Sequence, residues 1–150
     1  MPNFNTSGKM REMIEGWEGL RLDAYLDPVN IPTIGYGHTG PDVHLGQVIT
    51  QEQADQLLAN DLHKFETAVN GMAGENTTQG QFDAMVSFSF NLGSGALQSS
   101  TLLKKLLLGE YQEAAAEFLK WDHAGGVELE GLEERREGES EVYLSDSPAA

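Results

Sequence analysis

Hydrophobic residues recur at spacings of three and four through the first twenty positions of the chain. The repeating positions are Met10, Met13, Ile14, Trp17 and Leu20. Because this spacing puts them on one face, it predicts an amphipathic helix. Thr6 or Ser7 is the expected N-cap, since a side-chain oxygen there accepts from a free backbone amide. Gly19 weakens a helix, so the helix is expected to end near Glu18.

Short segments rich in strand-forming residues follow this helix. They are residues 24–26 and 33–36, with 47–49 as a third candidate. Between the first two lies Asp-Pro-Val-Asn, residues 27–30. Pro28 fixes the backbone angle of the first central turn position, and Asn30 tolerates a positive φ. The pattern therefore predicts a hairpin turn between the first two strands.

The apolar pattern of the remaining chain is helical. A capping box of Thr50 and Gln53 precedes a long apolar stripe that ends at Val69. A second capping box, Thr78 with Gln81, precedes a segment that is apolar on more than one face. That segment is expected to be a buried central helix, because a helix without a polar face is stable only when covered on all sides.

Weaker signals divide the C-terminal part into shorter helices. One is expected to be capped by Ser99 or Ser100 and closed by Gly109, and another begins near Tyr111. A loop at residues 125–126 precedes a last helix over residues 132–144, and the polar tail beyond is expected to be frayed.

These elements predict an α+β fold that is mainly α, in a single domain covering residues 1–150. A small N-terminal lobe, about residues 8–50, carries a short antiparallel sheet. A long helix, about residues 51–70, links it to a larger helical lobe, about residues 71–144. We expect a cleft between the two lobes.

Composition narrows the classes of function. The chain has no cysteine, so it forms no disulfide and no thiolate site, and its net charge is −15. That charge argues against nucleic acid and anionic membranes as partners, but it does not oppose a polysaccharide. No apolar run reaches membrane-spanning length, and the N-terminus lacks a signal-peptide core. We therefore expect synthesis in the cytoplasm without a signal or anchor.

The acidic residues are concentrated toward the C-terminus. From Glu110 onward the chain has twelve Asp or Glu and three Lys or Arg. Most of these acids are expected to lie on a solvated helical surface. Arg135 or Arg136 could contact Glu18 and orient its carboxyl. Pairing of these arginines with neighbouring glutamates on the helix surface is the simpler interpretation.

Two acids and a hydroxyl lie close together in sequence at Glu18, Asp27 and Thr33. If the Glu18 carboxyl packs against Trp17 and Leu20, loss of hydration favours its neutral form, which a general acid needs near neutral pH. Backbone amides of the turn and solvent can keep Asp27 ionised, and Thr33 can share a water with it. Such a set supports acid/base hydrolysis of a glycoside, and the sequence leaves the inverting and retaining outcomes open.

Each of the three residues also has an ordinary structural explanation. Glu18 can be a solvated helix residue, Asp27 a turn residue and Thr33 a strand former. His38 is expected to make a structural hydrogen bond. The remaining histidines lack metal-ligand spacing, so neither a metal nor a cofactor is expected.

The joint pattern resembles the phage-type lysozymes, the endolysin muramidases of glycoside hydrolase family 24. The resemblance rests on Glu-Gly-Leu-Arg-Leu, then Ala-Tyr-x-Asp, then Thr-Ile-Gly-Tyr-Gly-His-Thr, between residues 18 and 39. It continues in family order through Gln81-Phe82-Asp83-Ala84, Phe88 to Gly93, Ser100 to Leu103, Trp121 to Gly126 and Arg135-Arg136. It therefore covers nearly the whole chain.

The resemblance implies a function and a site. The implied reaction is hydrolysis of the β-1,4 bond between N-acetylmuramic acid and N-acetylglucosamine in bacterial peptidoglycan, with inversion, for host cell lysis. Glu18, Asp27 and Thr33 match the catalytic set of the family. Asn91 matches a position that faces the cleft, although a capping role is an equal alternative.

Two aromatic residues and the mode of release complete these expectations. Tyr25 and Tyr36 could line sugar subsites or simply pack within the small lobe. We expect a monomer that waits in the host cytoplasm for a holin-type pore and acts on the cell wall after release, without inserting into the membrane.

The sequence also departs from the family pattern. Asn30-Ile31-Pro32 stands where relatives often have Gly-x-Trp, so the turn beside Asp27 can take a different shape. Glu134 and Gly138 also stand where relatives often differ. Two other functions stay open: a non-catalytic wall-binding or virion-associated homologue, and a lytic transglycosylase, which needs the acid but no water-activating aspartate.

Overall fold

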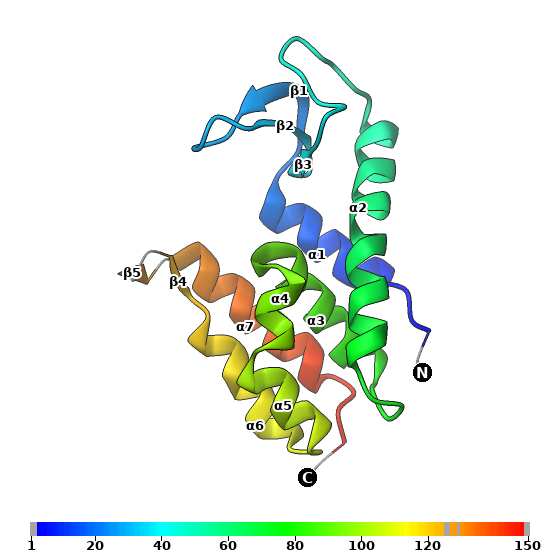
Figure 1. Ribbon diagram of the computed structural model, residues 1–150, viewed down its shortest axis with the longest axis vertical. Helices are drawn as coiled ribbons and strands as arrows, with labels where there is room; N and C mark the ends of the chain where they lie inside the picture. The colour runs from blue at the N-terminus through cyan, green and yellow to red at the C-terminus, as the bar shows by residue number, and fades with distance from the viewer. Residues whose placement is uncertain (1–2, 125–126, 129, 149–150) are drawn as a thin grey trace. The chain divides into compact units, whose positions relative to one another are not determined.

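The computed structural model describes residues 3–124, 127–128 and 130–148 (Figure 1). The chain divides into two compact units. The small unit is Arg11–Lys64, and the large unit combines Met1–Met10 with Phe65–Ala150. The predicted loop at residues 125–126 lies outside the described residues.

The small unit is built around a three-stranded antiparallel sheet in the order β1-β2-β3. Its strands are β1 (Arg21–Leu26), β2 (Pro32–Gly35) and β3 (His38–Thr39). It also includes most of α1 (Gly8–Glu18) and the first part of α2 (Gln51–Met72). The capping box of Thr50 and Gln53 is present, since each backbone amide donates to the other residue's side chain, at 2.9 and 3.1 Å.

The strand predictions were partly wrong. Residues 47–49 do not form a third strand; they reach β1 through hydrogen bonds from Ala24 N to Gln47 O and from Ile49 N to Leu22 O. The third strand is β3 instead. Two residues are too few to show an alternating pattern, so only the pairing with β2 reveals this strand.

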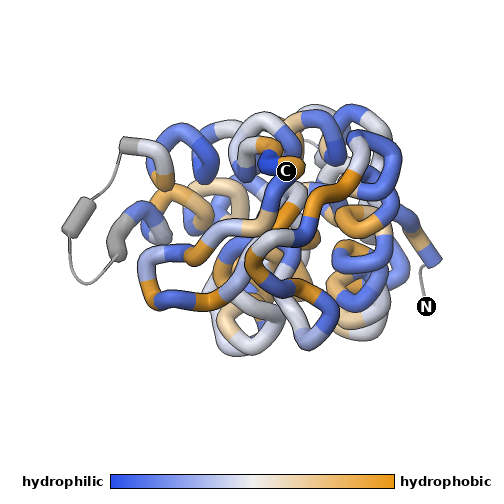
Figure 2. Tube along the Cα trace, turned by 90° about the horizontal axis from the view of Figure 1, so that it is seen from above, coloured by the Kyte–Doolittle hydropathy of each residue, from blue (hydrophilic) through white to orange (hydrophobic). Residues whose placement is uncertain are grey.

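The large unit is helical, and α3 (Gln79–Leu92) is its central element. Every residue from Gly80 to Ser89 is buried, which confirms the predicted central helix, and Thr78 with Gln81 forms the predicted capping box. Around it the chain forms α4 (Ser94–Gln98), α5 (Thr101–Leu107), α6 (Tyr111–Glu117), the 3-10 helix η1 (Phe118–Lys120), the strands β4 (His123–Ala124) and β5 (Val127–Glu128), and α7 (Glu130–Leu144). In Figure 2 the helices carry both apolar and polar residues, as expected for helices with one buried face.

An aromatic cluster joins the helices of this unit. The Phe88 ring on α3 lies edge-on to Phe118 at 5.8 Å and to Trp121 at 5.3 Å between ring centroids. Phe118 in turn contacts Tyr143 of α7 at 5.6 Å. Such edge-on pairs add to the free energy gained from burying the rings.

Both ends of the described chain are fixed to the large unit. Ser7 is the N-cap of α1, since its Oγ accepts from Met10 N at 3.2 Å, and its own N–H and O–H donate to the Asp83 carboxylate. The expectation of a frayed tail is wrong for Asp146. Its carboxylate accepts from the Thr78 hydroxyl at 2.6 Å and from Gly80 N at 3.0 Å, at the N-terminus of α3.

Candidate active site

Glu18 is the last residue of α1 and is half-buried. The helix stops there because Gly19 has a φ of 74° and its N–H donates to Glu15 O at 3.0 Å. The turn between β2 and β3 passes against the Glu18 carboxyl. A Cβ on Gly37, whose φ is +82°, would lie 3.2 Å from Glu18 Oε1. A glycine at this position therefore leaves room for the carboxyl.

The Asp27 carboxylate organises the turn after β1. Its Oδ1 accepts from the amides of Val29 and Ile31, both at 2.9 Å. The Asp27 backbone adds a hydrogen bond to Ile31 O at 3.0 Å, and Asn30 has the positive φ expected of it, 64°. Within the described part of the chain, Oδ2 accepts no hydrogen bond. One oxygen is thus used to shape the turn, and the other remains available.

Thr33 lies on β2 and is 4% exposed. Its register partner is Tyr25 on β1. Tyr25 and Thr33 therefore lie on the same face of the sheet, and Asp27 follows directly after the end of β1. The Thr33 hydroxyl donates to Ile31 O at 2.9 Å. Ile31 therefore contacts both residues, with its N–H bonded to Asp27 and its carbonyl bonded to Thr33.

The predicted substrate-binding residues Tyr25, Tyr36 and Asn91 lie in three different settings. Tyr25 is half-buried, with the Arg21 guanidinium 4.4 Å from its ring centroid. Tyr36 is 7% exposed, and its hydroxyl accepts from Gln51 Nε2 at 2.7 Å. Burial raises the pKa of this phenol. This setting favours packing, the alternative that the sequence left open for Tyr36.

Asn91 lies on α3 in the large unit, whereas the other predicted site residues lie in the small unit. Its Oδ1 is buried and has no hydrogen-bond partner among the described residues. The helix ends after it with Gly93 N donating to Ser89 O at 2.7 Å, a cap made by the backbone. A buried amide oxygen without a partner is a group that a bound donor can satisfy.

His38 makes the structural hydrogen bonds expected of it. Nδ1 lies 2.8 Å from Asp61 Oδ2 on α2, and Nε2 lies 2.9 Å from Asp42 Oδ2. Burial opposes the charged imidazole, but the hydrogen bonds and negative charges of the two aspartates raise the pKa of His38 overall. The sequence carried no signal for Asp61, because 23 residues separate it from His38.

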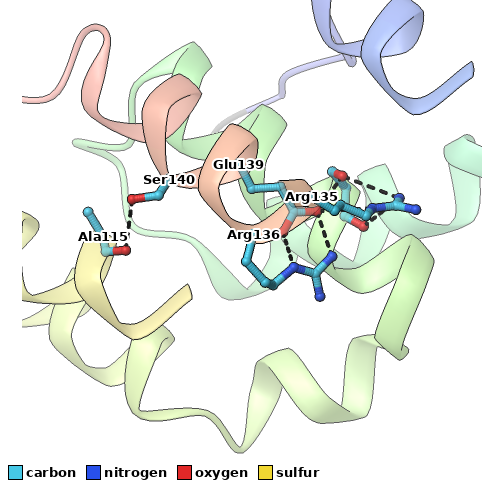
Figure 3. Close-up of polar contacts among 6 residues, drawn as sticks. Ala115, Arg135, Arg136, Glu139 and Ser140 are labelled. Carbon is cyan, nitrogen blue, oxygen red and sulfur yellow. Dashed lines mark hydrogen bonds and ion pairs between the residues drawn. The ribbon is translucent and has the colours of Figure 1, made fainter. Parts of the chain in front are cut away.

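Arg135 and Arg136 were expected to pair with neighbouring glutamates on the helix surface, but both side chains are buried in the large unit (Figure 3). Glu139, which is fully buried, pairs with both. Arg136 contacts its carboxylate at 2.7 and 2.9 Å, and Arg135 Nε lies at 3.4 Å. The Ser87 hydroxyl on α3 donates to the same carboxylate. Burial raises the pKa of Glu139 against the opposing effect of the two guanidinium groups.

The described residues contain neither a cluster that could hold a metal ion nor a helix that could span a membrane. No group of three or more His, Cys, Asp or Glu side chains there is arranged to hold a metal ion. None of the helices in that part of the chain has both the length and the apolar character of a membrane span.

Comparison with known proteins gives consistent matches. The family model described as phage lysozyme matches residues 15–139. The endolysin of Bacillus phage B103 is 48% identical over 95% of this chain, which corresponds to 55% of that endolysin. The chain thus spans about half the length of this relative and of a second Bacillus phage endolysin.

Solved structures agree over most of the chain. The endolysin from Escherichia coli O157:H7 phage FAHEc1 superposes with a TM-score of 0.90 at 40% identity, covering 99% of both chains. The muramidase domain of SpmX from Asticaccaulis excentricus superposes with a TM-score of 0.87 at 38% identity, covering 93% of this chain and 97% of that one. The lysozyme-like fold expected from the sequence is confirmed.

Proposed function

This chain belongs to the phage lysozyme family, and from that premise we propose that it is an endolysin. The proposed reaction is hydrolysis of the β-1,4 bond between N-acetylmuramic acid and N-acetylglucosamine in bacterial peptidoglycan. The observation that carries the proposal is the pair of hydrogen bonds at Ile31, which tie Asp27 and Thr33 to one residue.

Glu18 is the proposed general acid. It lies at the end of α1, against the glycine of the turn between β2 and β3. A carboxylic acid there donates its proton to the leaving glycosidic oxygen, which would otherwise depart as a poor alkoxide leaving group. The close approach of Gly37 restricts the positions of the carboxyl, and such positioning is a large part of the catalytic effect of an acid.

Asp27 and Thr33 are proposed to hold the attacking water. The Thr33 hydroxyl uses its proton on Ile31 O, so toward a water it can act only as an acceptor. Asp27 Oδ2 is likewise an acceptor. A water that donates one hydrogen to each of them has its lone pairs directed away from both, toward a sugar carbon. Asp27 then takes a proton as the water attacks, and the anomeric centre is inverted.

Substrate contacts are proposed at the predicted positions. Asn91 offers a buried amide oxygen to an N–H or hydroxyl donor of the sugar. Tyr25 offers a partly exposed ring two residues from Asp27. For Tyr36 we propose a supporting role, since its hydroxyl is engaged with Gln51. The biological part of the proposal is synthesis as a monomer in the host cytoplasm and release through a holin-type pore.

Digestion of purified peptidoglycan tests this proposal. Mass spectrometry of the fragments should show reducing N-acetylmuramic acid ends. Anhydro ends would instead identify a transglycosylase, and intact polymer would identify a binding protein. Either result refutes the proposed reaction.

Matched variants test the residue roles. Glu18→Gln should lower the rate of cell-wall clearing by at least about 1,000-fold, whereas Glu12→Gln, an exposed glutamate on the same helix, should keep it. Asp27→Asn should lower the rate similarly, and the exposed Asp23→Asn should not. Circular dichroism confirms that each variant is folded. Near-normal clearing by Glu18→Gln would overturn the assignment of the acid.

A further inference from the structure

A pocket of about 270 Å³ in the large unit is lined by the loop that joins α2 to α3, by the end of α5 and by the turn that follows it. Its lining includes Glu75, Asn76, Thr77, Leu107, Leu108 and Tyr111. None of the proposed catalytic or substrate-binding residues lines it. We propose that this pocket is a second, non-catalytic binding site for an N-acetylated sugar.

The two walls of the pocket differ in chemistry. Leu107 and Leu108, at the end of α5, are 55% and 65% exposed, and Tyr111 adds an aromatic ring. The loop between α2 and α3 contributes Asn76 and Thr77 to the lining, and these residues carry an amide and a hydroxyl group. A pyranose has the matching division, with a C–H face that packs on apolar and aromatic groups and an edge of hydroxyl and acetamido groups that need hydrogen-bond partners.

The charge of the lining selects against other small ligands. A carboxylate, Glu75, lines the pocket, and no Lys or Arg is among its lining residues. Lys105 on α5, which is not among the lining residues, is paired with Glu110 and Glu113 at 3.0 and 3.2 Å. A phosphate or other anion would therefore find no cationic side chain among the lining residues. A neutral sugar needs no such cation.

Backbone hydrogen bonds fix both walls in advance. Thr77 N donates to Gly74 O at 3.1 Å, which closes the first loop. In the second, Gly109 has a φ of 78° and its N–H donates to Leu106 O at 3.0 Å, while Glu110 N donates to Lys105 O at 2.9 Å. A pocket with preformed walls binds a ligand without the entropic cost of ordering a loop.

The choice of an N-acetylated sugar rests on the proposed function, since peptidoglycan is a polymer of such sugars. A second attachment point would hold an insoluble polymer to the enzyme between cleavage events, because the second contact becomes intramolecular once the first has formed. The pocket contains none of the proposed catalytic residues, so a test can show loss of sugar binding in the pocket without loss of cleavage, or the reverse.

Nuclear magnetic resonance titration of the complete chain, labelled with nitrogen-15, tests the proposal. With tri-N-acetylglucosamine, the backbone amides of residues 74–77 and 107–111 should shift saturably, with a Kd of about 1 mM. Asn76→Ala and Tyr111→Ala should each weaken that binding at least about 5-fold. Leu119→Ala, which removes a 45% exposed side chain outside the pocket, should leave it unchanged.

The outcomes are distinct. Absence of saturable shifts at these amides overturns the proposal, and so does an equal response to tri-glucose, which lacks acetamido groups, or to N-acetyl-lysine methylamide, which supplies an ammonium group. Because Asn76 is an exposed loop residue, its variant keeps the test valid even if Tyr111→Ala unfolds. The proposed function fails by a different result, namely that the wild-type protein does not cleave soluble peptidoglycan fragments, which both pocket variants are expected to cleave normally.

Discussion

The contact between Gly37 and the Glu18 carboxyl allows a sharp test of how the acid is positioned. In Gly37→Ala the added Cβ would lie 3.2 Å from Glu18 Oε1, so the carboxyl must move by a few tenths of an ångström. The positive φ of +82° adds backbone strain of about 1–2 kcal/mol for any residue with a Cβ.

Gly46→Ala is the matched control for this change. Gly46 lies in the same unit and has a φ of +93°, but nothing lies within 4 Å of the position that a Cβ would take there. Both variants should therefore lose about 1–2 kcal/mol of unfolding free energy, which lowers the Tm by roughly 2–8 °C in a protein of this size. The strain is common to both, so any difference in activity reports the carboxyl contact.

The assay is the initial rate of clearing of a cell-wall suspension, measured beside the thermal unfolding curve of each variant. A misplacement of about 1 Å can cost 100-fold in rate, so a shift of a few tenths of an ångström should cost Gly37→Ala about 5- to 10-fold. Gly46→Ala should stay within about 2-fold of wild type. Equal rates for the two variants, at equal loss of stability, would refute the view that Gly37 positions the acid.

Three further predictions concern stability and charge. The pKa of His38 is higher in the folded protein than in the unfolded chain, where it is about 6.5. Its ion pairs therefore stabilise the fold fully at pH values below the unfolded-state pKa, and this stabilisation is lost as the pH rises through the folded-state pKa. The Tm advantage of wild type over His38→Gln should therefore be larger at pH 5.5 than at pH 9, and a difference independent of pH would contradict it. Gly80→Ala should destabilise the protein by about 3 kcal/mol in denaturant unfolding, because its Cβ would lie 2.5 Å from Asp146 Oδ1 and from Val142 O, whereas Gly95→Ala, with nothing within 4 Å, should be neutral or stabilising. The net charge of −15 should make lysis faster at moderate than at low salt, because an anionic wall repels the protein less when charges are screened, and a monotonic fall in rate with salt would exclude this.

The turn after β1 shows how a departure in sequence is accommodated. The Asn30-Ile31-Pro32 segment was expected to allow a different shape for this turn, and the contacts to Asp27 and Thr33 are made by the Ile31 backbone. Backbone N–H and C=O groups are the same in any residue except proline, which lacks the N–H. The side chain at this position can therefore vary while the turn still holds both Asp27 and Thr33.

The sequence by itself determined the features that depend on neighbouring residues. The helices from Gly8 to Leu92 were predicted together with the caps at Thr50 and Thr78, because a cap joins groups only three residues apart. The turn at Asn30 was predictable for the same reason, since φ preferences belong to single residues. The catalytic candidates were recognisable because all three fall within sixteen residues, Glu18 to Thr33, of one motif.

Only the tertiary structure decided which distant groups meet. It formed β3 by pairing with β2, bonded His38 to Asp61, and fixed Asp146 to the start of α3. It also buried Arg136 with Glu139, where the sequence indicated a solvated surface. These contacts depend on burial and on groups up to 68 residues apart, and the periodicity of a single segment carries no information about either.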